Sequence, residues 1–475
     1  MRLSSAAILS ILLAPAALIP ILLGSAGAAL AKDYYVVPPG TVQSCTSDGS
    51  QTCPWIGLGA LSPTTITGGD RLLLLDGNYG GLKLYQIAFA SPVVVQSLNG
   101  KNAHFDWINI VDGTKNVTFR NLSVWPSDPS LRVSPLVTAN TKASNIIVDG
   151  LDVRGVQASA DYMNWSLTDW QAYAPTGADL FSPDSIIQNS TFQGIYIGAA
   201  VEGANSSLIG NRVDGFAGDA YRILADNDVA SGNYSQNCFQ IDGNHTDGIQ
   251  SWADADGVIS GLTIEKNTFI EWNSTAVNAL HCSMEGVGFF DGPYQNILIR
   301  NNVISVTQYH GISVYGGMNV QILNNTVVNN KNIEGIAPWI GIFNNKNGTL
   351  AQNVLVANNL EMSIHSEVTA TAATFVNNSS LMGLNALFEN IATFDYRPTT
   401  ASGFIDTGDA ANAPPTDILG ASRPYGAGPD RGAYEINGTG GTTTGGTTTG
   451  GTTTGGTTGS PPPWSAKFLK PPKKS

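Results

Sequence analysis

A repeat of about 22 residues constrains the fold of this chain more than any other feature of its sequence. In each unit, apolar and variable residues alternate before an Asn, as they do in 117–122 (Val-Thr-Phe-Arg-Asn-Leu). The larger gaps between units predict loops inserted on one side of the repeat. The unit recurs around Gly150, Asn189, Asn211, Asn233, Asn267, Asn302, Asn325, Asn359 and Asn378.

This periodicity predicts an all-β fold, a single-stranded right-handed parallel β-helix. Each coil of such a solenoid has three short strands joined by turns and buries its faces against neighbouring coils. The recurrent Asn suits a turn position that tolerates left-handed backbone and hydrogen-bonds its counterpart in the next coil. A β-sandwich, the alternative, would need hairpin turns such as Asn-Gly between strands, and these are rare here.

Composition divides the chain into four segments. Residues 1–31 read as a secretion signal, with Arg2 before an apolar run and a small-x-small ending at Ala31. Pro15 and Pro20 interrupt that run, which disfavours a membrane anchor, and no later stretch is long enough to span a membrane. Residues 32–437 form the predicted β-helix with its caps, 438–460 a Gly/Thr-rich linker and 461–475 a Pro/Lys-rich tail. We therefore expect a secreted or cell-surface protein, whose basic tail is a candidate contact to the cell wall.

The charge of the chain excludes a nucleic-acid partner. Its net charge is −13, and removing the five positive charges of Arg2 and the four tail lysines leaves about −18 on the body. Such a surface repels a phosphate backbone.

Four cysteines in an exported chain are candidates for oxidation. Cys45 and Cys53 flank a short polar loop and are expected to form a disulfide. For Cys238 and Cys282 a bridge and two buried free thiols remain alternatives. The cysteine and histidine spacing does not resemble a zinc site.

Four similar segments between Gly218 and Tyr315 carry the candidate site. When they are aligned as adjacent strands about 4.8 Å apart, their residues form columns, three facing outward and one facing the core. A column of acidic residues beside a column of aromatic rings predicts a groove along the stack. The outward columns are Asp219, Asp247, Glu285 and His310, then Arg222, Gln250, Gly288 and Ser313, then Leu224, Trp252, Phe290 and Tyr315, and the core column is Tyr221, Ile249, Val287 and Ile312.

Two reactions fit this groove. Glycoside hydrolysis needs two carboxyl groups, and Asp219 and Asp247 on neighbouring coils would lie near the roughly 5–5.5 Å of a retaining pair. Crowding raises one pKa of such a pair, as an acid catalyst requires. β-Elimination from a uronic acid instead needs a base and a positive group, for which the candidates are Arg222, His245, His281 and Lys266.

Oxygen ligands for calcium are a third feature of this stretch. The candidates are Asp219, Asp226, Asp254 and Glu285.

Each candidate also has a structural interpretation. Asp247 could cap a turn, and Arg222 could pair with Asp219 or Asp247. His245 and His310 both begin strands on the predicted groove, which favours a functional role. Gln250 and the aromatic column of Trp252, Phe290 and Tyr315 are candidate substrate contacts, because rings stack on sugars, although the rings could also pack beneath a loop.

Taken together, these residues resemble a known superfamily. The opening Tyr34-Tyr35-Val36, the strand after Gly69-Asp70, the Asn repeat and the closing Asp430-x-Gly432-Ala433-Tyr434-Glu435 are similar to exported pectin-lyase-like β-helix proteins of bacteria. The closing motif, which follows Arg423-Pro424, is like the cap that precedes a surface-sorting tail in such proteins. The resemblance covers about residues 33–437 and implies the fold. The superfamily contains lyases, hydrolases, epimerases and non-catalytic adhesins.

A narrower likeness is to polygalacturonases. Asn244-His245-Thr246-Asp247-Gly248, followed by His310-Gly311, is similar to their order of motifs on successive coils. The chain departs from that order at Glu285-Gly286, where an Asp-Asp pair would stand, and the later Arg-x-Lys motif is absent. The sequence therefore favours a lyase acting on a uronic-acid polymer over a hydrolase, with a non-catalytic carbohydrate-binding or surface protein as the further alternative.

Overall fold

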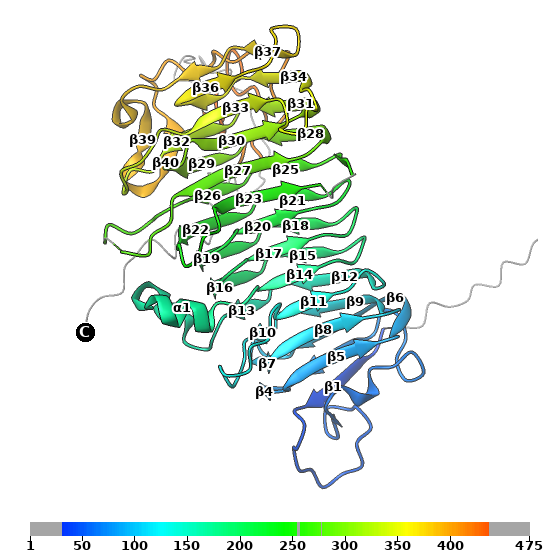
Figure 1. Ribbon diagram of the computed structural model, residues 1–475. Helices are drawn as coiled ribbons and strands as arrows, with labels where there is room; N and C mark the ends of the chain where they lie inside the picture. Colours follow the sequence, from blue (N-terminus) through cyan, green and yellow to red (C-terminus); the bar gives the residue numbers. More distant parts are fainter. Residues whose placement is uncertain (1–30, 254–256, 277, 437–475) are drawn as a thin grey trace, which may run out of the picture.

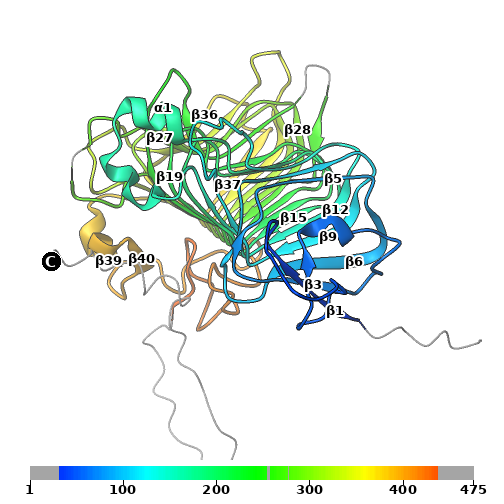
Figure 2. The same cartoon turned by 90° about the horizontal axis from the view of Figure 1, so that it is seen from below.

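The computed structural model describes residues 31–253, 257–276 and 278–436. The predicted secretion signal up to residue 30, the calcium candidate Asp254, and the predicted linker and tail lie outside these residues. Most described strands belong to three long parallel sheets, which the chain visits in turn within each coil. Figure 1 shows the coils stacked along one axis, and Figure 2 looks along the stack. The fold is a right-handed parallel β-helix, as the repeat predicts.

The largest sheet has 15 strands within the described residues. They are β1 (Asp33–Val37), β2 (Trp55–Ile56), β3 (Arg71–Leu74), β6 (Ala88–Ser97), β9 (Lys115–Arg120), β12 (Ser144–Asp149), β15 (Ile186–Gln188), β18 (Ser207–Ile209), β21 (Val229–Ser231), β24 (Ile259–Ser260), β25 (Thr263–Glu265), β28 (Tyr294–Arg300), β31 (Gly317–Leu323), β34 (Gln352–Ala357) and β37 (Ala373–Val376).

The second sheet has 12 strands in the described part of the chain. They are β4 (Gly77–Asn78), β7 (Ala103–Phe105), β10 (Ser123–Val124), β13 (Asp152–Arg154), β16 (Thr191–Ile195), β19 (Arg212–Phe216), β22 (Tyr234–Cys238), β26 (Thr268–Ile270), β29 (Val303–Val306), β32 (Thr326–Asn329), β35 (Leu360–Glu361) and β38 (Ser379–Ser380).

The third sheet, here called the site sheet, has 11 strands among the described residues. They are β5 (Gly81–Tyr85), β8 (Trp107–Val111), β11 (Val137–Ala139), β14 (Ala178–Leu180), β17 (Ala199–Val201), β20 (Tyr221–Ile223), β23 (Thr246–Trp252), β27 (Met284–Asp291), β30 (His310–Tyr315), β33 (Trp339–Phe343) and β36 (Ser363–Ser366).

Long loops connect strands of the second sheet to the strands of the site sheet that follow them. One of them carries the 3-10 helix η2 (Ser159–Asn164) and the helix α1 (Leu167–Tyr173), and others run through 239–245 and 271–283. Their apolar residues pack into a small separate cluster that includes Trp170, Phe239 and Trp272. The insertions thus gather on one side of the solenoid, and they cover the starts of the site-sheet strands.

An Asn ladder runs through the corner between the first two sheets. The side-chain oxygen of each member accepts the backbone N–H of its counterpart one coil earlier, at 2.8–3.0 Å. The expectation that the repeat Asn is left-handed is confirmed in the early coils, at Asn121 (φ 50°) and Asn189 (φ 51°). It is wrong for the ladder residues from Asn211 onwards. The left-handed residue immediately precedes each of them, for example Lys266 (φ 58°) before Asn267 and Asn301 (φ 54°) before Asn302. Two neighbouring positions therefore divide the roles of turning the backbone and bonding the coils.

The end of the described chain lies along this corner, and the expected cap over the open end of the solenoid is not confirmed. Side chains of the left-handed Asn301, Asn324 and Asn358 donate to carbonyl oxygens of Thr416, Asp430 and Asp409. The 3-10 helices η3 (Leu384–Ala386) and η4 (Ile391–Thr393) and the antiparallel strands β39 (Phe388–Asn390) and β40 (Asp395–Pro398) precede it. The closing segment thus fastens several coils together from outside.

Both cysteine pairs are disulfides, which confirms Cys45–Cys53 and settles Cys238–Cys282 as a bridge. A 3-10 turn, η1 (Leu58–Ala60), lies near the first coil. Among the described residues, no helix is both long and apolar enough to cross a membrane.

Candidate functional site

The expected columns form on adjacent strands of the site sheet. Arg222 pairs with Gln250, Gln250 with Gly288, and Gly288 with Ser313. In the acidic column, three residues earlier on each of the strands β23 and β27, Asp247 pairs with Glu285. The core column of Tyr221, Ile249, Val287 and Ile312 is wholly buried. The register aligns these columns, but strict alternation does not place the acidic one. Asp247 lies on the outer face although it is two residues from the inward Ile249, because Gly248 also faces the core, where its Cβ would meet the Phe269 ring.

The outer aromatic column differs from the prediction at one position. An irregularity between Ser251 and Trp252 pairs Trp252 with Asp291 rather than Phe290. The Trp252 ring instead lies under the guanidinium of Arg222, whose central carbon is 5.0 Å from the ring centroid. Phe290 and Tyr315 do meet, with ring centroids 5.4 Å apart.

The acidic column is buried rather than open. Asp219 and Asp247 are 0% exposed, and Glu285 and His310 are 7% exposed. His245, which immediately precedes β23, remains accessible, with its side chain 50% exposed. A substrate on this face would therefore meet His245 before it met the carboxyl groups.

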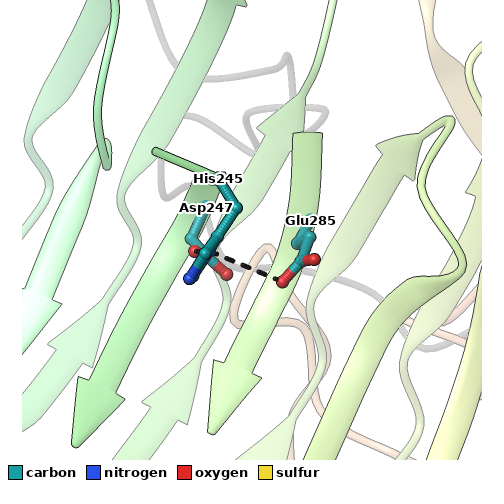
Figure 3. A group of neighbouring side chains, drawn as sticks. All are labelled: His245, Asp247 and Glu285. Carbon is teal, nitrogen blue, oxygen red and sulfur yellow. Dashed lines mark hydrogen bonds and ion pairs between the residues drawn. The ribbon is translucent and has the colours of Figure 1, made fainter. Parts of the chain in front are cut away.

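His245, Asp247 and Glu285 form the centre of the site (Figure 3). Nδ1 of His245 lies 2.8 Å from Oδ2 of Asp247 and 3.9 Å from Oε2 of Glu285. On the far side of the ring, the Gln250 amide nitrogen lies 3.4 Å from Nε2. A carboxylate at Nδ1 and an N–H donor at Nε2 together favour the neutral tautomer with its proton on Nδ1. Nε2 is then a proton acceptor on the accessible side.

Both carboxyl groups have raised pKa values. Burial, and then the neighbouring Asp247 charge, raises the pKa of Glu285 to about 8, which favours its protonated form at neutral pH. Burial, and then the charge of Asp219, raises the pKa of Asp247 well above its ordinary value. Among the described residues, Oδ1 of Asp247 and Oε2 of Glu285 have no hydrogen-bond partner when both groups are ionised. A proton shared between them supplies that bond, as in other crowded carboxyl pairs.

Arg222 is held by Asp219, three residues earlier on the same coil, which is the coil before that of Asp247. Its Nε donates to Oδ2 of Asp219 at 2.6 Å, and the other oxygen of Asp219 accepts the backbone N–H of Asp247 at 3.2 Å. Burial raises the pKa of Asp219, while Arg222 opposes that rise. The structural interpretation of Arg222 as a partner of Asp219 is thus confirmed, and the pair places a cation beside the centre.

His310 lies one coil beyond Glu285. Its Nδ1 is 2.8 Å from Oγ of Ser313, and its ring centroid is 4.7 Å from that of Phe290. Burial lowers the pKa of His310 to about 4. His310 is consequently a neutral, packed ring at the edge of the centre.

Three predicted residues lie elsewhere. His281 bonds to the buried Glu271 at 2.7 Å, within the loop before β27. Lys266 occupies the left-handed turn between the first two sheets, at the corner opposite the site sheet. Asp226 accepts the backbone N–H of Ser260. The structure therefore brings none of these three into the centre.

The residues present do not fit calcium. The ligand atoms of His245, Asp247 and Glu285 lie within 4.8 Å of one another. Calcium takes six to eight oxygen ligands, whereas this group offers one nitrogen and two carboxylates. Asp219 is engaged by Arg222, Asp226 lies in its own turn, and Asp254 is outside the described residues.

The disulfide Cys238–Cys282 joins the two loops that lead to His245 and to Glu285. Cys238 ends β22, from which the chain runs to His245, and Cys282 stands three residues before Glu285. Its Cα atoms are 5.5 Å apart. The bridge therefore ties the entry of β23 to the entry of β27.

Some outward residues were missed from the sequence. Asp179 and Glu202 interact on the strands before Arg222, and burial raises the pKa of Asp179 to about 7. Beyond His310, the rings of Trp339, Phe343 and His365 continue the aromatic face. The sequence does contain a signal for this extension of the aromatic face, because 339–343 repeats the apolar alternation of the four segments between Gly218 and Tyr315.

Comparisons with known proteins find similarity in fold. No family model matches the sequence, and no curated protein does. Pectate lyase Pel9A is similar in structure at 14% identity and a TM-score of 0.42, over 86% of this chain and 98% of that one. A rhamnogalacturonan lyase is similar at 12% identity and a TM-score of 0.46, over 76% and 91%. PfbA, a surface adhesin of Streptococcus pneumoniae, is similar at 10% identity and a TM-score of 0.38, over 66% and 85%.

Proposed function

We propose that this protein is a polysaccharide-active enzyme that cleaves a uronic-acid-containing polymer by β-elimination. The observation that carries the proposal is the contact of the exposed His245 with the buried, proton-retaining pair of Asp247 and Glu285. It supplies an accessible base and an acid side by side. Arg222, anchored by Asp219, supplies the positive charge that a uronate carboxylate needs.

In the proposed reaction, Nε2 of His245 takes the proton from C5 of the uronate. The electron pair of that C–H bond becomes the C4–C5 double bond as the C4–O bond breaks. The leaving oxygen takes a proton from Glu285, and Asp247 orients the imidazole through Nδ1. Arg222 binds the carboxylate next to C5 and stabilises the negative charge that develops there.

Hydrolysis is the second candidate, favoured by the placement of Asp247 and Glu285 on adjacent strands. An inverting hydrolase needs its two carboxyl groups about 6.5–9.5 Å apart, to leave room for water. A pair whose oxygens lie within 4.8 Å and share a proton is too close for that arrangement. Only the retaining variant, with its shorter spacing of about 5–5.5 Å, is compatible.

A panel of uronate polymers tests the proposal. Elimination creates an unsaturated uronate that absorbs in the ultraviolet, together with a new reducing end, whereas hydrolysis creates only the reducing end. Reducing ends without absorbance would support hydrolysis and overturn the elimination. Tight polymer binding with no product over long incubation would instead support a non-catalytic surface protein. Secretion and wall attachment through the tail are parts of the same proposal, tested by locating the protein in cell fractions.

A further inference from the structure

A row of rings extends from the centre towards the C-terminal coils of the site sheet. We call it the aromatic strip. Its members stand on four consecutive strands, β27, β30, β33 and β36, which Figure 1 shows stacked in that order. Three strand spacings make it about 14 Å long. The strip consists of Phe290, His310, Tyr315, Trp339, Phe343 and His365.

The rings form two lines that meet above a column of small residues. The Phe343 ring centroid lies 5.5 Å from that of His365 and 6.2 Å from that of Trp339. Tyr315 stacks on Phe343 at 4.7 Å, and Trp339 stacks on His365 at 4.8 Å. Beneath the lines the outward column reads Gly288, Ser313 and Gly341. A Cβ on Gly288 would lie 2.1 Å from Oδ1 of Asp247, and one on Gly341 would lie 2.5 Å from the Phe343 ring. The absence of a side chain at Gly288 and Gly341 therefore lets the Asp247 carboxyl group and the Phe343 ring lie close to the backbone of the sheet.

The strip is accessible and continuous with the centre. The His365 side chain is 49% exposed, and Phe290, Tyr315 and Trp339 are partly exposed. The Phe290 ring lies 6.1 Å from the His245 ring. A chain-like ligand in contact with His245 can thus continue onto these rings.

Charge is distributed unequally on the two sides of the centre. Towards the N-terminal coils the face carries Asp179, Glu202 and Asp219. Towards the C-terminal coils, Asp291 is paired with Lys346 and Glu367 faces His365 at 3.6 Å. On the first side Arg222 balances Asp219, so the named carboxyl groups there outnumber the basic groups, whereas each acid named on the second side lies against a basic group. A polyanion that meets Arg222 at the centre is therefore favoured to continue over the second side.

We infer that the aromatic strip is the main binding site for the polymer, and that a polyuronate lies along the stack from His245 towards His365. The inference rests on the proposed function and adds to it the direction of the bound chain and the residues that hold it. Sugar rings present C–H faces that stack on aromatic rings, and the hydroxyl and carboxylate edges of the chain remain towards solvent. Trp339, in the middle of the strip, is the central contact.

Binding to an inactive variant tests the inference apart from catalysis. Affinity electrophoresis in gels of each uronate polymer would compare Asp247→Asn with the same variant carrying Trp339→Ala, His365→Ala or Asn109→Ala. Asn109 faces outward on β8, at the other end of the site sheet, and is the matched control. We expect Trp339→Ala to weaken binding about tenfold, His365→Ala to weaken it less, and Asn109→Ala to leave it unchanged.

Equal binding by the Trp339→Ala and Asn109→Ala variants would overturn the inference. So would equal affinity for a neutral polysaccharide, or no binding of any polyuronate by the wild type. Melting temperatures of all variants identify any loss that arises from unfolding, and the exposed His365 provides a variant with little effect on packing. Failure of the proposed function looks different: turnover would be unchanged in Asp247→Asn while Trp339 is still required for binding.

Discussion

Nδ1 of His245 lies 2.8 Å from Oδ2 of Asp247, two residues along the same chain segment. Residues two apart in an extended segment face the same side, so the pair forms locally as β23 begins. The carboxyl group is buried and the imidazole is half-exposed. The pair therefore lies between solvent and the buried carboxyl groups, and the proposed acid–base chemistry depends on it.

Replacing Asp247 with Asn tests this pair directly. The amide keeps the shape of the side chain but removes the carboxylate that fixes the tautomer of His245. We expect turnover to fall roughly 10²–10⁴-fold, as for a lost acid or base group. The melting temperature should be unchanged or raised, because one buried charge is removed. Asp226→Asn, in a turn outside the centre, is the control and should retain turnover. Normal turnover with a lowered melting temperature in Asp247→Asn would make Asp247 a structural turn residue.

The proton on Glu285 makes both activity and stability depend on pH. Folding raises the pKa of this group from its ordinary 4.5 to about 8, so its contribution to stability is complete below about 4.5. That contribution is lost as the pH rises towards about 8. Activity that needs the protonated acid should decline over the upper part of the same range.

The matched variant is Glu285→Gln, which cannot ionise. We expect its melting temperature to exceed that of the wild type at pH 9 and to approach it at pH 5, while turnover falls roughly 10²–10⁴-fold. Glu389→Gln, on an exposed strand position, should follow the wild type at both pH values. A constant difference in melting temperature across the pH range would show that Glu285 does not titrate there.

The sequence predicted the fold and the main columns because both follow from periodicity. One Asn per coil fixes the repeat, and the register fixes which residues of β23 and β27 lie side by side. Strict alternation would turn Asp247 inward with Ile249, so the break at Gly248, which faces the core against Phe269, did not follow from the pattern. The buried state of Asp247 and Glu285 did not follow either, because it depends on contacts between coils, such as that of Asp247 with Asp219. The bulge after Ser251 moved Trp252 out of its column and has no counterpart in the pattern of apolar residues.

Long-range contacts account for the remaining differences. In the closing segment, the carbonyl oxygen of Thr416 accepts a hydrogen bond from the side chain of Asn301, which lies 115 residues earlier in the chain. No local sequence pattern predicts that contact. The sequence does contain a signal for the left-handed position at the corner. Gly210 and Gly232 precede Asn211 and Asn233, and Gly is the residue most tolerant of left-handed backbone. His281 lies outside the centre for another reason, because the buried Glu271 in the same loop holds its ring there.

The disulfide Cys238–Cys282 should matter for activity beyond its effect on stability. It ties together the loops that carry His245 and Glu285, so its loss should loosen the contact between them. For the double variant Cys238→Ser/Cys282→Ser we expect a loss of about 2–4 kcal/mol in the free energy of unfolding. We also expect a lower kcat at temperatures where the variant remains folded. The control, Cys45→Ser/Cys53→Ser, removes a bridge near the first coil and should lower stability without lowering kcat. Equal kcat values for the two double variants would assign both bridges to stability alone.

The Asn ladder should dominate the stability of the solenoid. Oδ1 of Asn302 accepts the backbone and the side-chain N–H of Asn267, and its own amide donates to the carbonyl oxygen of Ile264. In Asn302→Ala these buried groups lose their partner, and each such loss costs about 1–3 kcal/mol. We expect the free energy of unfolding to fall by roughly 3 kcal/mol or more. Asn319→Gly is the control, because Asn319 belongs to an exposed ladder where water replaces the lost bonds, and Gly tolerates its left-handed backbone (φ 57°). Denaturant unfolding of both variants checks the difference, and similar losses would show that burial of the ladder is not the source of its effect.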